Sequence, residues 1–219
     1  MHLCSRQRHS QMTLMRSLLG ASLLLPPSPV AVRIPASSVR MALSFEDAVA
    51  SAPDLCAKLQ ADEAPSELKP FLASSAGARG FFVNWLTNDD WTRADDVEPP
   101  NALANALADA PQEVADIMVM NVIMSAATAV AHRRAGRDEQ ADMSERTSVR
   151  ARHLVCALRE RVPALNVALL ALRAALAPDE DKPEGVDAEA EDAWVVFLQR
   201  WMYDDEQLDR VSEALSLCD

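Results

Sequence analysis

The segment 111–135 constrains the fold more than any other part of the chain. Pro111 opens it, acidic residues occupy its first turns, and a His-Arg-Arg triplet ends it shortly before Gly136. These are the residue types that the helix dipole and the helix caps favour at each end. Apolar side chains cover most of the helix circumference, which predicts that this helix is central in its domain.

The other periodic segments also favour helices. They are rich in Ala and Leu, the chain has only 5 glycines, and no alternation of period two is long enough to indicate a strand. We expect an all-α fold, a compact bundle of about six to eight helices in one domain, 42–219, with an acidic linker at 178–192. The further expected helices lie near 44–61, from Ser66, and near 81–86, 146–161, 163–176, 188–202 and 204–217. Residues 87–101 are expected to form a loop, and 136–147 a polar connection.

Residues 1–41 have the composition of a targeting presequence. They contain five arginines and no lysine or acidic residue, and they are rich in serine, as organellar transit peptides are. The stretch SVRMA, Ser38–Ala42, resembles a plastid stromal cleavage site. We expect a chloroplast or plastid protein of the stroma, with the mitochondrion and secretion as alternatives. The uncharged stretch 17–32 leaves open a simple transit peptide or a bipartite signal.

The rest of the chain is strongly acidic. The whole chain carries −12 and residues 1–41 carry +5, so residues 42–219 carry −17. Phosphates are repelled by such a body, which argues against nucleic-acid binding. The stretch 117–132 is apolar but includes four polar side chains, and it fits a core helix better than a membrane span. We therefore expect no integral membrane segment in the mature part, with peripheral membrane association as an alternative.

The sequence lacks the usual signatures of catalysis. It has no P-loop, GxGxxG, HExxH or GxSxG motif, so we expect no catalytic residue, no metal and no cofactor. Beyond residue 41, the only histidines are His132 and His153. Cys56, Cys156 and Cys218 are odd in number and form no CxxC motif. We expect reduced thiols, with one bridge and one free thiol as the alternative.

A line of polar side chains runs along the predicted helix 111–135. Its members follow one another at spacings of four, three and four residues: Asn121, Ser125, Thr128 and His132. Such a line inside a core must find hydrogen-bond partners. We favour close helix packing with side-chain bonds to the backbone. The alternative is a seam that lines a ligand or partner pocket, to which Arg79, between Gly77 and Gly80, would contribute.

Residues 133–161 are positively charged in an otherwise acidic chain, because they contain eight arginines and five acidic residues. Arg146 and Arg150 lie on one helical line with His153 and Arg161. Such a line could bind an anion, a lipid headgroup or an acidic partner. The interpretation we favour is internal, with acidic residues of the segment 179–192 folded back on the arginines.

Eight of the ten aromatic residues form two clusters. One comprises Phe81, Phe82, Trp85 and Trp91, and the other comprises Trp194, Phe197, Trp201 and Tyr203. Aromatic side chains dominate buried area, so we expect both clusters to meet in one core. Trp85 and Trp201 are predicted to be buried in the same helical layer.

Three stretches carry a family resemblance. They are GARGFFVNWLT at 77–87, MVMNVIMSAATAVAHRR at 118–134 and FLQRWMYDDEQ at 197–207. Together they resemble an uncharacterised family of small all-helical proteins of cyanobacteria and plastid-bearing eukaryotes, over roughly residues 65–217. The resemblance implies a photosynthetic context. It implies no site residues, because the motifs consist of core aromatics.

These observations lead to two functional hypotheses. The first is a non-catalytic plastid protein that binds a protein partner, such as an assembly or regulatory factor or an accessory subunit of a photosynthetic complex. The second is a small-molecule or pigment binder that uses the polar line Asn121–His132 and Arg79. The partner-binding candidates on the arginine-rich face are Arg146 and Arg150.

Overall fold

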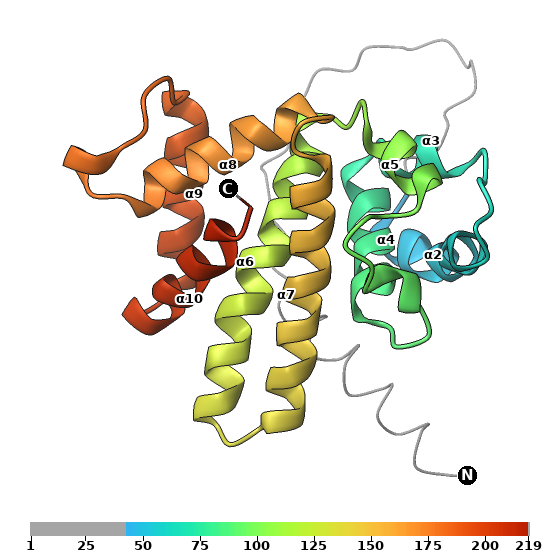
Figure 1. The fold of residues 1–219 in the computed structure, drawn as a ribbon, viewed down its shortest axis with the longest axis horizontal. Helices are drawn as coiled ribbons and strands as arrows, with labels where there is room; N and C mark the ends of the chain where they lie inside the picture. The colour runs from blue at the N-terminus through green and yellow to red at the C-terminus, as the bar shows by residue number, and fades with distance from the viewer. Residues whose placement is uncertain (1–42, 219) are drawn as a thin grey trace, which may run out of the picture. The chain divides into compact units, whose positions relative to one another are not determined.

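The computed structural model describes residues 43–218, and every regular element in that range is helical (Figure 1). The predicted all-α class is confirmed. The described elements are α2 Phe45–Gln60, α3 Leu68–Leu72, α4 Ser75–Thr87, η1 Thr92–Ala94, α5 Asn101–Leu107, α6 Gln112–Arg134, α7 Asp138–Leu158, α8 Pro163–Leu176, η2 Asp179–Asp181, α9 Ala188–Trp201 and α10 Asp205–Ser216. The expected presequence 1–41 lies outside the described residues, which belong to one compact unit, Ala42–Asp219.

Helices α6 and α7 form an antiparallel hairpin at the centre of the described structure (Figure 1). The Arg137 amide donates to the carbonyl of His132 at 3.0 Å, and Gly136 adopts a φ of 64°, which is the Schellman ending of a helix. The turn is therefore short, and α7 begins at Asp138. The expected polar connection 136–147 is wrong beyond this turn, because acidic residues in the first turn of α7 favour a helix there.

Helix α6 holds the central position that its sequence predicts. It packs against α4 and α7, and on its other side against α8 and α10 (Figure 1). It is the one described helix long and apolar enough to cross a membrane, but 67% of its apolar stretch is buried inside the protein. Such burial suits a core helix, so no clear integral membrane segment emerges from the described residues.

The N-terminal layer, α2 to α5, packs closely on one side of the hairpin. Helix α4 approaches α2 so nearly that a Cβ on Gly80 would lie 2.6 Å from the backbone of Ala48. Asn84 Nδ2 donates to the Val49 carbonyl at 3.1 Å across the same contact. Helix α4 begins at Ser75, six residues before the expected start at Phe81, because the Ser74 side chain caps it by accepting a hydrogen bond from the Gly77 amide at 3.1 Å. The absence of a side chain at Gly80 lets the two backbones approach.

The C-terminal layer, α8 to α10, lies on the opposite side of the hairpin (Figure 1). Its end is joined to α7 by a disulfide between Cys156 and Cys218, whose Cα atoms are 5.0 Å apart. Cys56 remains a buried free thiol, and burial raises its pKa to about 12. The expectation of three reduced thiols is therefore wrong, and the alternative of one bridge and one free thiol holds.

The two aromatic clusters do not meet. Helix α4 carries Trp85 in the N-terminal layer, whereas α9 carries Trp201 in the C-terminal layer, with the hairpin between them (Figure 1). Trp85 is 2% exposed, and Trp201 is only half-buried. The prediction of a shared layer is wrong because α6 is apolar on most of its circumference, so it supports a separate layer on each side.

Candidate functional site

The side chains of the polar line on α6 are buried or half-buried within the fold. Asn121 is half-buried and its Nδ2 donates to the Ile117 carbonyl one turn earlier, at 2.8 Å. Ser125 and His132 are buried, and Thr128 is half-buried. Nδ1 of His132 accepts a hydrogen bond from Arg137 Nε at 3.2 Å. Burial first, and then the charge of Arg137, lower the pKa of His132 and favour its neutral form.

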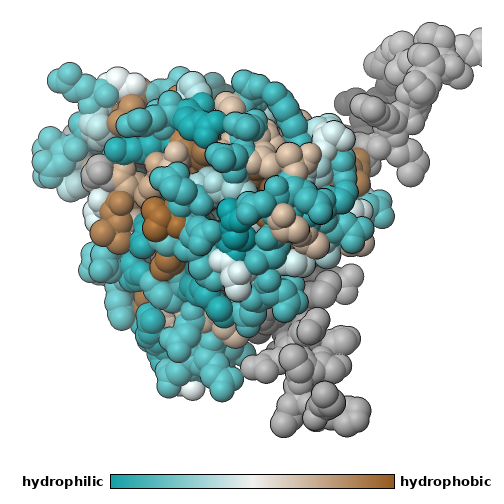
Figure 2. Space-filling model, turned by 45° about the vertical axis from the view of Figure 1, so that its right-hand side comes forward, coloured by the Kyte–Doolittle hydropathy of each residue, from teal (hydrophilic) through white to brown (hydrophobic). Residues whose placement is uncertain are grey.

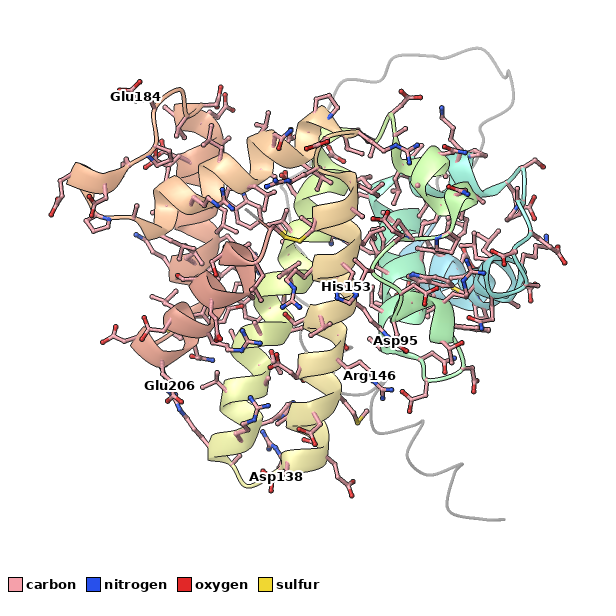
Figure 3. The ribbon with its side chains drawn as sticks, viewed as in Figure 1. Asp95, Asp138, Arg146, His153, Glu184 and Glu206 are labelled. Atoms are coloured by element: carbon pink, nitrogen blue, oxygen red, sulfur yellow. A yellow bond between two sulfur atoms is a disulfide. The ribbon has the colours of Figure 1, made fainter. Side chains whose placement is uncertain are left out.

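Arg150 is a structural residue rather than a free surface group. It is 2% exposed and forms a two-bond ion pair with the Asp95 carboxylate, at 2.6 and 2.8 Å. It also donates to the carbonyls of Asn88 at 2.9 Å and Leu86 at 3.3 Å. This guanidinium holds the pKa of Asp95 below its usual range. The contacts tie the end of α4 and the following loop to α7, on the side where Figure 3 labels Asp95 and His153.

The arginines of 133–161 take their partners from outside the acidic linker. Arg146 pairs with Asp89 at 2.5 Å, near the end of α4. Arg134 pairs with Asp204 and Glu206 at the start of α10. Lys182, inside the linker, pairs with Glu191 of α9 at 2.8 Å. The favoured interpretation, that 179–192 folds back on these arginines, is therefore wrong, because nearer loops and helix ends supply the carboxylates.

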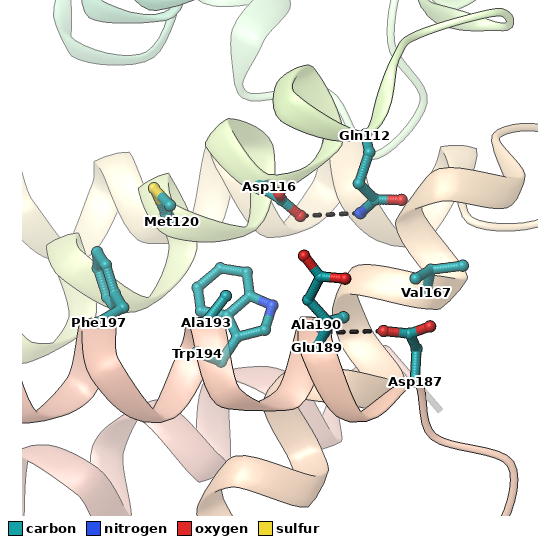
Figure 4. A pocket seen from close by; sticks show the side chains of 10 residues that line it. All are labelled: Gln112, Asp116, Met120, Val167, Asp187, Glu189, Ala190, Ala193, Trp194 and Phe197. Atoms are coloured by element: carbon teal, nitrogen blue, oxygen red, sulfur yellow. Dashed lines mark hydrogen bonds between the residues drawn. The ribbon is translucent and has the colours of Figure 1, made fainter.

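Two hollows flank the first turns of α6. The larger, which we call the α6–α9 hollow, has a volume of about 380 Å³ and lies between α6, α8 and α9 (Figure 4). The smaller, of about 350 Å³, is lined by residues of α4 and α6 and includes Arg79. Asp116 and Met120 line both. None of Asn121, Ser125, Thr128 and His132 lines either hollow.

The α6–α9 hollow is acidic above an aromatic floor. Trp194 and Phe197 of α9 line it with ring centroids 5.5 Å apart. Asp116 and Glu189 bring carboxylates to it from opposite walls (Figure 4). Burial raises the pKa of Asp116, although a hydrogen bond from Gln112 at 2.9 Å opposes the shift. No lysine or arginine lines this hollow among the described residues.

Arg79 is exposed on α4, where it lines the smaller hollow together with Glu113 and Asp116. It forms no ion pair with any described residue. Arg79 does not pair with the C-terminal helices, because α4 and those helices lie on opposite sides of the hairpin (Figure 1). Arg79 is thus free to contact a ligand or partner at the surface.

Helix α9 leaves much of its apolar surface uncovered. Of its residues only Trp194 is buried, whereas Val196 is 63% exposed. At its end, Met202 is 85% exposed and has a φ of 48°. Residues other than glycine and asparagine rarely take this left-handed conformation. Elsewhere the surface is mostly hydrophilic, and hydrophobic residues form small patches on the face in Figure 2.

We call the segment Trp201, Met202 and Tyr203 the α9–α10 corner. Acidic residues follow it directly, and Asp204 and Gln207 form a capping box at the N-terminus of α10. The sequence does identify these aromatics as a cluster, but it predicts burial for them. What could have pointed to exposure is the −11 net charge of residues 178–219, because such a segment is difficult to bury.

The described residues offer no group of histidine, cysteine, aspartate or glutamate side chains that could hold a metal ion. Together, the fold and these surfaces define an all-α protein with a closed N-terminal layer and an open C-terminal layer. Residues 44–218 match the family described as uncharacterised conserved protein UCP020893, and the chain belongs to this family. Neither a curated protein nor a solved structure matches the chain.

Proposed function

We propose that the protein binds a protein partner without catalysing a reaction, and that the α9–α10 corner is the docking surface. The observation that carries this proposal is the exposure of Met202 between two aromatic residues. Its left-handed backbone holds a large apolar side chain in solvent, at a cost of about 1–2 kcal/mol. Local strain of this kind often accompanies a functional surface.

The charge around the corner supports a partner with positive charge. Residues 178–219 carry fourteen acidic and three basic residues, so the corner lies in an acidic surrounding. A partner segment with apolar side chains and positive flanks would bury the corner and neutralise its surroundings. The acidic residues would also speed its association at low ionic strength.

The cellular context is also a proposal, and it comes from the presequence. The composition of residues 1–41 supports a plastid location, where the partner would belong to a photosynthetic complex that the protein assembles, regulates or joins as an accessory subunit. Fusing residues 1–41 to a fluorescent protein in an algal cell tests the location. Plastid fluorescence is expected, and mitochondrial or secreted fluorescence would contradict it.

Substitution of Met202 by glycine tests the docking surface. Glycine accepts the left-handed backbone, so Met202→Gly removes the side chain while raising the free energy of unfolding by up to about 1 kcal/mol. The full chain with a C-terminal tag is expressed in algal cells, and captured proteins are cross-linked and quantified by mass spectrometry. We expect the variant to lose most of the captured partner despite its higher melting temperature.

Val97 provides the matched control, because it is 65% exposed in the loop after η1, within the opposite layer. Val97→Glu is expected to leave capture unchanged. Equal capture by the wild type and both variants would contradict docking at the corner. Cross-links from the corner to an acidic partner segment would contradict the charge argument.

A further inference from the structure

One face of α9 carries a stripe of four exposed residues. They follow one another at spacings of four, three and four: Glu189, Ala193, Val196 and Arg200. Residues spaced in this way lie on one side of a helix. The stripe therefore runs the length of α9 from an acidic end, across a small and a larger apolar residue, to a basic end. We call it the α9 stripe.

The α9 stripe is complementary to itself when two copies run antiparallel. The centre of the stripe falls between Ala193 and Val196, so a twofold axis there places Glu189 opposite Arg200 and Ala193 opposite Val196. Every contact then occurs twice, as a twofold interface requires. The small Ala193 side chain leaves room for Val196 of the other copy, and each end joins opposite charges.

The charges around the stripe lack partners within one copy. Glu189 forms no ion pair with any described residue, and Asp116, across the α6–α9 hollow, is held only by the neutral Gln112 side chain. Arg200 also has no ion pair within the described residues, and it is exposed. Around α9 and α10, other carboxylates do find cations, as Glu191 of α9 does with Lys182 and Glu145 of α7 does with Arg210 of α10.

We propose that the protein forms a twofold dimer through antiparallel pairing of two α9 stripes. Arg200 of the second copy meets Glu189 at the rim of the α6–α9 hollow, where no basic residue of the chain itself is found. Its guanidinium lies near Asp116 and above the aromatic floor, which favours a cation. The proposal does not depend on the proposed function, because the α9–α10 corner lies outside the stripe.

Charge reversal tests the pairing in the full chain. Sedimentation equilibrium across the micromolar range is expected to show a dimer, since a helix of 14 residues offers a small interface and weak affinity. Glu189→Arg and Arg200→Glu are each expected to weaken dimerisation by about tenfold, because each places like charges at two symmetry-related contacts. Mixing the two variants is expected to restore dimers, and so is combining both changes in one chain.

Matched controls separate these contacts from general charge effects. Glu184→Arg and Arg79→Glu make the same charge changes at exposed positions outside α9 and are expected to leave dimerisation unchanged. Circular dichroism and melting temperature verify that each variant folds. A second disruptive change, Val196→Asp, acts at the centre of the stripe and is expected to give a monomer.

Two results would overturn the proposal. One is a wild-type chain that stays monomeric throughout the concentration range. The other is a dimer that the two charge reversals leave intact, or that their mixture fails to restore. A monomeric wild type whose partner capture still depends on Met202 would reject the dimer and retain the docking function. A wild type that dimerises, but whose partner capture is unchanged by Met202→Gly, would reject the docking function and retain the dimer.

Discussion

The two aromatic helices of this protein, α4 and α9, have similar apolar content but opposite environments. Phe81, Phe82 and Trp85 of α4 are each at most 2% exposed, and the rings of Phe81 and Trp85 stack with centroids 5.9 Å apart. In α9, only Trp194 is buried. The difference teaches that aromatic residues do not by themselves indicate a closed core. The number of elements that surround a helix decides how far its aromatic side chains are buried. Helix α4 lies among α2, α3, α6 and α7, whereas α9 packs chiefly on α8.

The largest expected effect comes from removing a core ring in each layer. Phe81→Ala should lower the free energy of unfolding by about 3–5 kcal/mol, because Phe81 is fully enclosed. Phe197→Ala should cost less, about 2 kcal/mol, because Phe197 is only partly buried. Urea denaturation measures both. Equal losses would show that the two layers are equally closed in solution.

A comparable loss is expected from the buried arginine of the N-terminal side. Arg150→Ala leaves Asp95 and two carbonyl groups without their donor, and should cost about 2–4 kcal/mol, because the guanidinium is buried while the Asp95 carboxylate is partly exposed. Arg146→Ala removes a half-exposed pair on the same helix and should cost about 0–1 kcal/mol. Chemical denaturation at neutral pH checks the contrast, and similar losses for both would contradict the structural role of Arg150.

The same pair predicts a dependence on pH. The folded pKa of Asp95 lies below its unfolded value, so its contribution is complete above the unfolded pKa of about 4 and is lost as pH falls through the folded pKa. Arg150→Ala should flatten this acid-side loss in denaturation curves recorded from pH 6 downwards to about pH 2. An unchanged slope in the variant would assign the loss to other carboxylates.

A smaller effect is expected in the C-terminal layer from the disulfide. Cys156 and Cys218 are 62 residues apart, and closing a loop of this length stabilises a fold by about 2–4 kcal/mol. A dithiol reductant, or the double change Cys156→Ser and Cys218→Ser, should lower the melting temperature. Cys56→Ala is the control, because it removes the free thiol and leaves the disulfide in place. Its melting temperature should still fall when the reductant is added. An unchanged melting temperature after reduction would show that the disulfide does not stabilise the C-terminal layer.

Much of the fold follows from local sequence. Helix α6 occupies 112–134 against an expected 111–135, and α10 occupies 205–216 against 204–217, because caps and charged end turns act within a few residues. The sequence does not predict the first turns of α7, because the polar residues 138–147 also suit a loop. Their acidic first turn favours a helix, and so does their position beside α6, which buries Ala141, Thr147 and Ser148.

The candidate sites are less visible in the sequence. The sequence singles out Arg150 as a surface group, but its partner Asp95 lies 55 residues away, and no local pattern reports that distance. The aromatic residues of 194–203 are recognised as a cluster. The sequence does not predict that Trp194 is buried while Phe197, Trp201 and Tyr203 are only partly buried, because burial depends on which elements pack nearby.

Local sequence and composition account for the all-α chain, the central apolar helix and the acidic body. Total charge and interactions between residues three or four positions apart need no tertiary context. The tertiary structure alone decided that Cys156 meets Cys218, that the aromatic clusters lie on opposite sides of α6 and α7, and that the stripe of α9 remains open. Those outcomes depend on which face of the hairpin each layer covers, and that choice is made by the sum of long-range contacts.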